Sequence, residues 1–597
     1  MRRRVCALVG LLVALGALLG ACRGVPQPSQ PVPPRVPTPP SAEPPPVLPT
    51  PTPVALPPVV AEPTPTPTLV PPPGPPLKYG GILRNAQADT PPSCDLRMEE
   101  GRAYAAVFAC SPMLNQLVKY EGGGYEKVVP DLAQAWEVQD GGRTWVFRLG
   151  DARWHDGLPV TSADVLYSLE AVLHPPAGMR VGRAGALQRY IEQMDAPDPK
   201  TVVIRLKFPA PSFLPTLALV YASIFPRHHL MHLVPPSPKT PDLVVGSGPF
   251  TFRRWLPGSF VELARNPHYF LKDRPYVDGY TIYIMPDATS RLAALRTRQI
   301  DMLSADALRR EDVAELLAHP RLREQIIVHT HYANSVATLQ INTVAAHRDP
   351  RTGRVVDWGD LRLRQALNLA IDRHEVRTAV YGGLGALGGL LPPYSPWGLT
   401  EEEVARLPGM APTGPAKEAE RVQARRLLVE AGFPEGLDVP LLVRSAPTPL
   451  ALASALQEQA KTIGVGVHLV ALEGPRYWEA LARREFVLLA HIHTLPLFDP
   501  DLVFASHALC GGPENYPGVC DPVLEDLFRR QQEEMDPARR REVVRAFQRR
   551  YQEVLGKMTL VWEVRHPAWW GYVKGYTPTP LYYLQHGSRM EEVWLDR

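Results

Sequence analysis

The sequence lacks an excess of charge of either sign. Its 597 residues carry 64 Lys and Arg against 61 Asp and Glu, which gives a formal net charge of +3. No basic block stands out along the chain, although a surface that binds nucleic acid needs clustered positive charge to neutralise phosphates. We therefore expect no nucleic-acid partner.

Long apolar runs are also scarce, and the one at the N-terminus is short for a membrane span. Arg2, Arg3 and Arg4 precede the uncharged run VCALVGLLVALGALLGA, which ends at Cys22. A positive start and a short apolar run without a stop-transfer charge pattern are typical of a secretory signal peptide. An ordinary signal would be cut near Ala21, whereas Leu-Gly-Ala-Cys resembles the lipobox of bacterial lipoproteins.

The lipobox interpretation makes residues 1–22 a lipoprotein signal peptide and Cys22 the site of lipid attachment. One acyl chain holds a protein only marginally, at ~0.8 kcal/mol per buried CH2, whereas two or three chains hold it stably. We therefore expect the mature protein in the cell envelope, on the outer face of the cytoplasmic membrane, periplasmic or extracellular.

Cysteine is sparse as well. Apart from one residue in the apolar run and Cys22, the chain has only Cys94, Cys110, Cys510 and Cys520. An even number of cysteines in an exported chain indicates disulfides, and the local pairings are Cys94 with Cys110 and Cys510 with Cys520, although four cysteines allow three connectivities. Neither pair has C-x-x-C spacing, so we expect no metal site.

Proline, in contrast, is abundant near the N-terminus. Residues 23–76 consist mainly of Pro, Thr, Val and Ala and hold about two dozen of the 68 prolines. Such a segment lacks the apolar density for a core, so we expect a disordered stalk that is partly polyproline II. At ~3.1 Å per residue it could reach on the order of 150 Å. A wall-associated or O-glycosylated spacer is the alternative.

The remaining chain alternates strand and helix patterns and shows no internal repeat. Thr144–Gly150 and Thr201–Phe208 alternate apolar and polar residues, which predicts half-buried strands. Leu361–Tyr381 has apolar residues at helical spacing and ends at Gly382, which predicts one helix. This part of the chain, after the proline-rich segment, has about 520 residues, a length that implies more than one domain. The mixed order favours α/β lobes.

Further helix starts are marked by capping residues. Thr161 to Asp164 form a pattern typical of a capping box. Near the C-terminus, Asp521-Pro522 and Asp536-Pro537 each place a capping Asp before a Pro in the first helical position, where the missing N–H is not needed.

No set of residues assembles into an enzyme site. Asp156-Gly157 followed by Pro159 is turn chemistry, and His155 has neither a nucleophile nor an orienting group nearby in the sequence. Gly382–Gly389 lacks the Lys-Ser/Thr of a P-loop, and Gly246–Gly248 lacks the Gly-x-Ser-x-Gly spacing of a nucleophile elbow. Three histidines lie close together in the sequence, namely His228, His229 and His232. No Asp, Glu or Cys lies at a spacing that would complete a metal site with them, so we favour a helix start on the surface.

Several motifs together resemble one family. The stretch from Val128 to Val172 contains Pro-Asp-Leu-Ala, a Trp, a strand, an aromatic-x-Asp-Gly-x-Pro turn and an Ala-Asp-Val helix start. This pattern is similar to the family 5 extracellular solute-binding proteins, the peptide-, nickel- and sugar-binding receptors of ABC importers. Further segments match in the family's order, from about Tyr79 to the C-terminus: Gly246–Phe270, Asp287–Leu303, Ile341–Thr343, Arg364–Val376, LVEAGFPEG, EQAKTIGV and FDPDLVFAS.

The resemblance implies an α/β, two-lobed, periplasmic-binding-protein-like fold of type II, in the large class with an extra inserted subdomain. It places the crossings between lobes near His331–Asn334 and Met558–Trp562. The implied parts are the lobe I core at 77–118, 246–332 and 560–597, the inserted subdomain at 119–245, and lobe II at 333–559.

The resemblance also implies a function without enzyme activity or cofactor. We expect the substrate-binding lipoprotein of an ABC importer, a monomer that captures a small solute of the oligopeptide or dipeptide class, or another polar ligand, between its lobes. Its partners would be this ligand, the permease subunits and the membrane through the lipid. The alternative is a stalked surface receptor or adhesin that uses the fold for sensing.

Ligand contacts are harder to assign. Peptide binders of the family hold the substrate's amino group with an Asp, but the corresponding position here is Pro496. Asp499 or Asp501 could substitute, although helix capping is the favoured role. Strand alternation puts His491 and His493 on one face, where they could line the cleft or pack against helices.

Paired histidines also keep a metal-chelate ligand as a minority hypothesis, since nickel-binding relatives use a chelating small molecule. The remaining candidates for the ligand site are aromatic residues: Tyr104, Tyr332, Trp397 and Phe498. The loop CGGPENYPGVC, from Cys510 to Cys520, resembles the disulfide-closed loop of dipeptide-binding members, which concerns the scaffold.

Overall fold

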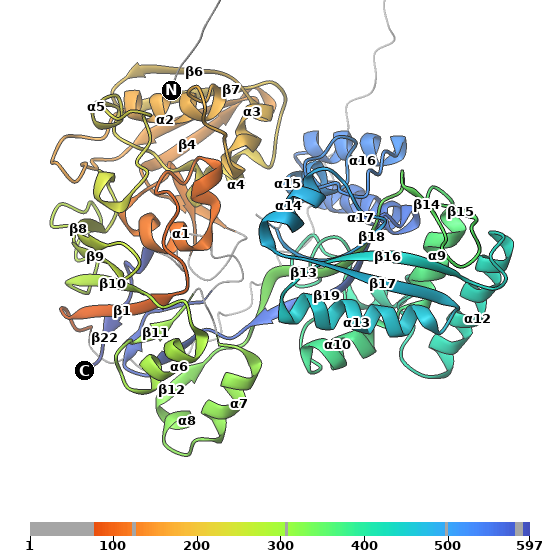
Figure 1. The fold of residues 1–597 in the computed structure, drawn as a ribbon. Coiled ribbons are helices and arrows are strands. Elements are labelled where there is room, and N and C mark those ends of the chain that lie inside the picture. The colour runs from red at the N-terminus through yellow and green to blue at the C-terminus, as the bar shows by residue number, and fades with distance from the viewer. Residues whose placement is uncertain (1–76, 122–126, 305–307, 496–498, 579–588) are drawn as a thin grey trace, which may run out of the picture. The chain divides into compact units, whose positions relative to one another are not determined.

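The computed structural model describes residues 77–121, 127–304, 308–495, 499–578 and 589–597. The signal peptide, Cys22, the stalk, Pro496 and Phe498 lie outside these ranges, so the predictions made for them stay predictions. Three large sheets organise the described residues, together with the helices that cover them (Figure 1). None of the described helices combines the length and apolar character that a membrane span requires.

Lobe I is built on a seven-stranded sheet assembled from distant parts of the chain. In spatial order its strands are β12 (Ile326–Val328), β20 (Ala568–Trp570), β11 (Met302–Leu303), β1 (Ile82–Gln87), β10 (Gly279–Ile284), β9 (Phe260–Arg265) and β8 (Phe250–Leu256). Strand β1 runs parallel to both of its neighbours, β10 and β11. The helices of this part are α1 (Tyr104–Cys110), α6 (Ala288–Arg296), α7 (Arg310–Ala318) and α8 (Leu322–Gln325).

A second, antiparallel sheet of four strands is inserted in lobe I. Its order is β4 (Ala133–Gln139), β5 (Thr144–Leu149), β7 (Thr201–Leu206) and β6 (Ile191–Asp198), which confirms both predicted strands. Its helices are α2 (Ser162–Leu173), α3 (Leu187–Tyr190), α4 (Phe213–Leu217) and α5 (Arg227–Leu230). The predicted capping box is present, since the Thr161 N–H donates to the Asp164 carboxylate at 2.9 Å.

Lobe II contains a five-stranded sheet with helices on both faces. Its order is β17 (Val465–Leu472), β16 (Leu437–Arg444), β18 (Leu488–Thr494), β13 (His331–Ile341) and β19 (Lys557–Arg565). Strand β16 is parallel to β17 and β18, and β13 is antiparallel to β18 and β19. One core cluster joins the sheet to α9 (Leu361–Ala370), α10 (Arg373–Tyr381), α12 (Pro415–Glu430) and α13 (Pro447–Lys461). The other face meets α14 (Gly474–Ala482), α15 (Pro500–His507), α16 (Pro522–Glu533) and α17 (Pro537–Val554).

Short elements complete the described chain. They are α11 (Glu401–Ala405) and the paired strands β2 (Val118–Tyr120) with β3 (Val128–Pro130), β14 (Ala346–Arg348) with β15 (Val355–Asp357), and β21 (Val573–Lys574) with β22 (Trp594–Leu595).

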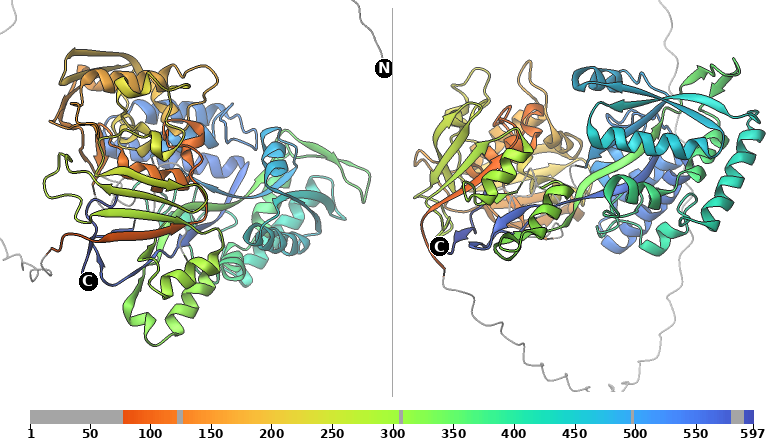
Figure 2. Two further views of the ribbon diagram at one scale, coloured as in Figure 1. Left: turned by 60° about the vertical axis from the view of Figure 1, so that its left-hand side comes forward. Right: turned by 60° about the horizontal axis from the view of Figure 1, so that its bottom comes forward.

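Two neighbouring strands carry the chain between the lobes. Strand β13 follows β12 of the lobe I sheet, and β19 precedes β20 of the same sheet, so the changes of sheet fall at residues 329–330 and 566–567. His331 is paired with Arg565 at this end, and Figure 2 shows β13 and β19 together from two further sides. Strand β19 stays in the lobe II sheet as far as Arg565.

The single helix predicted over 361–381 is wrong, because the structure has two helices there. Helix α9 ends at Ala370, and the Asp372 carboxylate accepts the N–H groups of His374 and Glu375, both at 3.0 Å, to cap α10. The apolar periodicity continues across the break, so it did not reveal the change. Gly382 ends α10 in the left-handed conformation with φ +62°, as predicted.

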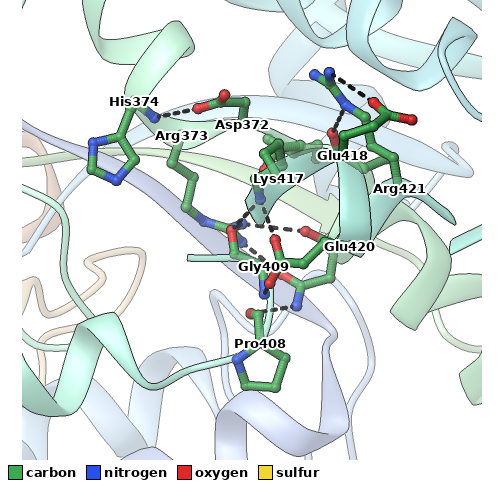
Figure 3. A network of polar contacts seen from close by, with 12 residues as sticks. Asp372, Arg373, His374, Pro408, Gly409, Lys417, Glu418, Glu420 and Arg421 are labelled. Carbon is green, nitrogen blue, oxygen red and sulfur yellow. Dashed lines mark hydrogen bonds and ion pairs between the residues drawn. The ribbon is translucent and has the colours of Figure 1, made fainter. Parts of the chain in front are cut away.

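A buried cationic pair secures the start of α10 (Figure 3). The Arg373 guanidinium donates to the carbonyl oxygens of Thr559 and Gly409, both at 2.8 Å, and to Asn368 Oδ1 at 2.7 Å. The Lys417 ammonium donates to the carbonyl of Gly409 at 3.0 Å. These bonds connect α9, α10 and α12 to the lobe II sheet.

The structure gives His155 a scaffold role. Its Nδ1 accepts the Gly246 N–H at 3.2 Å, which leaves Nε2–H to donate to the Gly248 carbonyl at 3.3 Å. Both glycines allow close approach, since a Cβ on Gly246 would lie 1.8 Å from the carbonyl oxygen of Met113. His155 therefore connects the Asp-Gly turn to the Gly-Ser-Gly segment.

The turn and the disulfides follow the sequence patterns. Gly157 has φ +88°, and the Asp156 carboxylate accepts the Leu158 N–H at 3.1 Å, as turn chemistry requires. Both local cysteine pairs are bonded, with Cα–Cα distances of 5.5 Å for Cys94–Cys110 and 4.5 Å for Cys510–Cys520.

Candidate functional site

A pocket of about 250 Å³ lies at the carboxyl edge of the lobe II sheet. Strands β16 and β18 are parallel and end here, between the start of α13 and the helix α14. In α/β sheets, ligands bind outside the carboxyl ends of the strands, so this edge is the expected place for a site. The pocket is lined by Arg444, Thr448, Pro449, Tyr477, Trp478, Ala490, His491, Ile492 and Glu563.

A larger hollow of about 530 Å³ in lobe I is a weaker candidate. Its charged groups are already paired inside the protein: Lys119 lies 2.7 Å from Glu591, and Arg274 lies 2.8 Å from Glu592. A ligand would have to compete with these ion pairs, whereas the lobe II pocket offers unpaired groups.

A row of histidines runs inward from the pocket. His491 and His493 project from the same face of β18, as the alternation predicted, and their ring centroids are 5.6 Å apart. His493 in turn lies 4.9 Å from the ring of His507 in α15. His491 both lines the pocket and packs against α14, where its Nδ1 is 2.6 Å from the Tyr477 hydroxyl. His493 packs against α15 and is not among the lining residues.

This histidine row is uncharged. Burial, together with the positive charges of nearby Lys557 and Arg444, lowers the pKa of His491 to about 3. Burial also lowers the pKa values of His493 and His507 well below the usual range. Lys557 lies 3.0 Å from His507 Nδ1, and burial lowers its own pKa to about 7. The row therefore contributes neutral hydrogen-bonding groups.

The charged groups of the pocket are Arg444 and Glu563. The exposed Arg444 side chain has no ion pair or hydrogen bond to any described residue. The Glu563 carboxylate accepts the Ser335 hydroxyl at 2.6 Å, and burial together with this carboxylate raises the pKa of Tyr381. Trp478 is 49% exposed and offers an apolar surface beside the cation.

A metal site is not supported by the described residues, among which no three His, Cys, Asp or Glu side chains are arranged to hold an ion. His228 instead contacts Asp156 at 2.7 Å, and His229 contacts the Leu243 carbonyl at 2.9 Å. His228 and His229 thus have structural partners.

The bacterial extracellular solute-binding proteins, family 5, match residues 127–515 of the chain. The chain belongs to this family. It is accordingly a member of a family of solute-binding proteins and not of enzymes.

Several relatives of this family 5 protein are known. A putative ABC transporter peptide-binding protein of Brucella ovis is 32% identical over 269 residues, which is 43% of this chain and 45% of that relative. The chain thus aligns with less than half the length of that protein. A probable di/tripeptide-binding protein of Pseudomonas aeruginosa is 28% identical over 70% of this chain and 78% of its own.

The fold is shared with solved structures. The periplasmic binding protein AgaA of A. tumefaciens R10, in complex with agropinic acid, superposes with a TM-score of 0.70 at 24% identity, over 87% of this chain and 99% of that one. The two-lobed periplasmic-binding-protein fold is therefore confirmed for this family 5 protein.

Asp499 caps a helix and joins the lobes instead of lining the pocket. Its carboxylate accepts the Asp501 N–H at 2.9 Å, which confirms the capping role, and pairs with Arg540 at 3.0 Å. It also accepts the hydroxyl of Ser212, from the inserted subdomain, at 2.6 Å. Both oxygens of the Asp499 carboxylate thus have partners within the protein.

Asp501 makes a second connection between lobe II and the inserted subdomain. Its buried carboxylate accepts hydrogen bonds from Tyr190, from Arg189 at 2.7 Å and from Gln531 at 3.2 Å. Burial raises the pKa of Asp501, while the charge of Arg189 opposes this. Neither Asp499 nor Asp501 is among the residues that line the lobe II pocket.

The three described aromatic candidates lie outside the pocket lining. Tyr104 starts α1, and its hydroxyl donates to Asp89 at 2.9 Å. Tyr332 is 41% exposed and stacks on Tyr394 with ring centroids 4.6 Å apart. Trp397 packs beneath the Arg540 guanidinium at 4.7 Å. Tyr332 lies on the crossing strand β13, so it is the nearest of the three in sequence to the change of lobe.

Sequence reasoning named only His491 among the pocket residues. The missed residues with polar or aromatic side chains include Arg444, Tyr477, Trp478 and Glu563. A signal existed for Arg444, because it follows the buried strand LDVPLLV and so stands at a carboxyl end. No comparable signal marked the others, whose apolar or charged character is ordinary for an amphipathic helix and a strand end.

Proposed function

We propose that this protein is the extracellular substrate-binding component of an ABC importer, which captures a small solute between its lobes and delivers it to a membrane permease. The observation that carries the proposal is the pocket at the carboxyl edge of the lobe II sheet. It adjoins Glu563, which lies on the strand that returns to lobe I. A solute held there sits where lobe movement can enclose it.

Closure follows from contacts that only one arrangement of the lobes makes. A ligand shifts an open–closed equilibrium only if it binds the two states differently. The bonds from Arg189, Tyr190 and Ser212 to lobe II are of this kind, because both partners must approach. The ligand adds its own bridging contacts to them.

The names of relatives support solute capture but leave the solute open. The Brucella and Pseudomonas proteins are named for peptides, and the A. tumefaciens structure contains agropinic acid. This chain has Pro496 where peptide binders of the family carry an amine-binding Asp. Tyr332, on the crossing strand β13, and Trp397, in lobe II, remain candidate contacts with the solute.

The proposal includes attachment through Cys22, followed by the proline-rich stalk. Replacing Cys22 by Ala should release the protein from the membrane fraction into the soluble envelope fraction, because the lipid would be lost. Retention of the variant in membranes at the wild-type level contradicts lipid anchoring and leaves solute capture untouched. Immunoblotting of fractionated cells measures the result.

Native mass spectrometry of protein purified from its own host tests solute capture directly. We expect a small molecule to leave on partial unfolding, and its re-addition to reduce the radius of gyration in small-angle scattering. A protein whose scattering is unchanged by every recovered solute is not a closing receptor. Permease and ATPase genes beside its own gene would favour import over sensing.

A further inference from the structure

We propose that the lobe II pocket recognises the carboxylate of a small organic acid through Arg444, His491 and the start of α13, an inference that rests on the proposed solute capture. The pocket presents hydrogen-bond donors and one unpaired cation on one side. Its remaining wall is apolar apart from the Glu563 carboxylate. Both features define a ligand with an acidic head group and an apolar or aromatic body.

His491 supplies the first donor, through its tautomer. Tyr477 is 1% exposed, and a buried hydroxyl must donate its hydrogen. The acceptor within reach is His491 Nδ1, at 2.6 Å. With Nδ1 accepting, the neutral imidazole carries its hydrogen on Nε2.

The Nε2–H group has no partner in the described chain. His491 is 4% exposed, yet it lines the pocket and its Nε2 makes no hydrogen bond to a described residue. A donor in this position would remain unsatisfied without a ligand or water, so it selects an acceptor. A carboxylate oxygen is the strongest such acceptor.

Arg444 supplies the charge. It follows the last buried residues of β16 and lies beside His491 at the same edge, and its guanidinium has no ion pair with a described residue. Other buried or half-buried arginines among the described residues pair with carboxylates: Arg540 with Asp499, Arg589 with Asp131 and Arg189 with Asp501. A free guanidinium in a pocket matches a carboxylate through two parallel hydrogen bonds.

The start of α13 adds to this positive side. The helix begins at Pro447 without a side-chain cap, and Thr448 and Pro449 of its first turn line the pocket. Because Pro447 and Pro449 have no N–H, Thr448 supplies the backbone donor of this turn, and the helix dipole favours an anion at this end. These three elements, β16, α13 and β18, converge on one head group.

The body of the ligand meets apolar and acceptor groups. Trp478, Pro449 and Ile492 form its apolar wall, and Glu563 is placed to accept an N–H or O–H from the ligand. The volume of about 250 Å³ lies below the ~300–1,000 Å³ common for drug-sized ligands, so the ligand is small. A bare ammonium would face Arg444 and is disfavoured.

The test uses five probes that separate the head group from the body. Indole-3-acetate, indole-3-acetamide and tryptamine share one ring system and differ in charge, while Ala-Phe and Ala-Phe-amide test whether a peptide C-terminus supplies the acid. Isothermal titration calorimetry on the full chain should show an acid binding at least tenfold tighter than its amide, about 1.4 kcal/mol, with tryptamine weakest.

Variants assign the effect to the pocket. Arg444→Gln should weaken acid binding at least tenfold and amide binding by a smaller factor, because the amide head group carries no charge. His491→Phe should also weaken acid binding. Arg426→Gln, on the exposed surface of α12, is the matched control and should bind like the wild type. Circular dichroism checks that each variant is folded.

The proposal is overturned if the amide or amine binds as tightly as the acid, if Arg444→Gln binds acids normally, or if no probe binds. These results stay distinct from a failure of solute capture, because native mass spectrometry detects any solute whatever its head group.

Discussion

The hydrogen bond between Tyr190 and Asp501 offers a direct test of how the lobes are held together. Tyr190 belongs to the inserted subdomain, and Asp501 lies in α15 of lobe II. Replacing Tyr190 by Phe removes the hydroxyl alone. The Asp501 carboxylate keeps Arg189 at 2.7 Å and Gln531 at 3.2 Å, so no buried charge is left unpaired.

The expected effect follows from the class of bond lost. A hydrogen bond to a charged group contributes roughly 1.5–3 kcal/mol, which is a roughly 10- to 150-fold shift in an equilibrium. Because the partners lie in different lobes, this energy acts on the closed arrangement. Small-angle scattering of the Tyr190→Phe variant should therefore show a larger radius of gyration than the wild type.

A matched substitution separates this effect from a general loss of stability. Tyr280 is fully buried in lobe I, and its hydroxyl accepts from Asn85 at 2.8 Å within the same lobe. Tyr280→Phe should lower the melting temperature and leave the scattering profile unchanged. If the profile of Tyr190→Phe superimposes on that of the wild type, the contact does not hold the lobes together and the reasoning fails.

Three further predictions concern stability. Arg373→Met should lower the free energy of unfolding by roughly 3–5 kcal/mol, because the buried acceptors of Thr559 and Asn368 lose this donor and the Gly409 carbonyl keeps Lys417 alone; a urea-unfolding loss under about 1 kcal/mol contradicts this. Lys557 has a pKa lowered to about 7 by burial, so the unfolded chain binds its proton below about pH 10.4 and the folded chain only below 7. The stability that Lys557 contributes is thus highest above about pH 10, falls by ~1.4 kcal/mol per pH unit as the pH is lowered from about 10 to 7, and is constant below about pH 7. The difference in unfolding free energy between Lys557→Met and the wild type should follow this slope, and a difference that does not change with pH refutes the reasoning. Replacing Cys510 and Cys520 by Ser should cost roughly 2–3 kcal/mol, measured by the same unfolding method, and an unchanged midpoint would show that the ten-residue loop needs no bond.

Helix starts were predictable where a capping residue stood beside a break in the apolar pattern. Asp521 and Asp536 cap α16 and α17 as expected, because an Asp followed by Pro satisfies the first turn locally. Asp372 has the same role between α9 and α10, yet the apolar pattern on either side concealed it. Helix caps could therefore be predicted from the sequence, except where the apolar periodicity continued across the cap.

The candidate site was predictable only in part. Alternation along β18 correctly put His491 and His493 on one face, because side chains in a strand have a period of two. Which of them reaches the pocket depends on α14 and α15, whose positions no local pattern encodes. Arg444 and Trp478 join His491 because β18 returns to pair beside β16 after α13, β17 and α14.

The amino-acid sequence alone determined the family, the mixed α/β character and the local turns and caps, since each depends on residues close together in the chain. The tertiary structure decided which charges are free. Asp499 accepts a hydrogen bond from Ser212, and Asp501 accepts hydrogen bonds from Arg189 and Tyr190, all about 290 to 310 residues away in the chain. Arg444, in contrast, forms no ion pair with a described residue. Charge pairing depends on distance in space, and only the folded chain sets that distance.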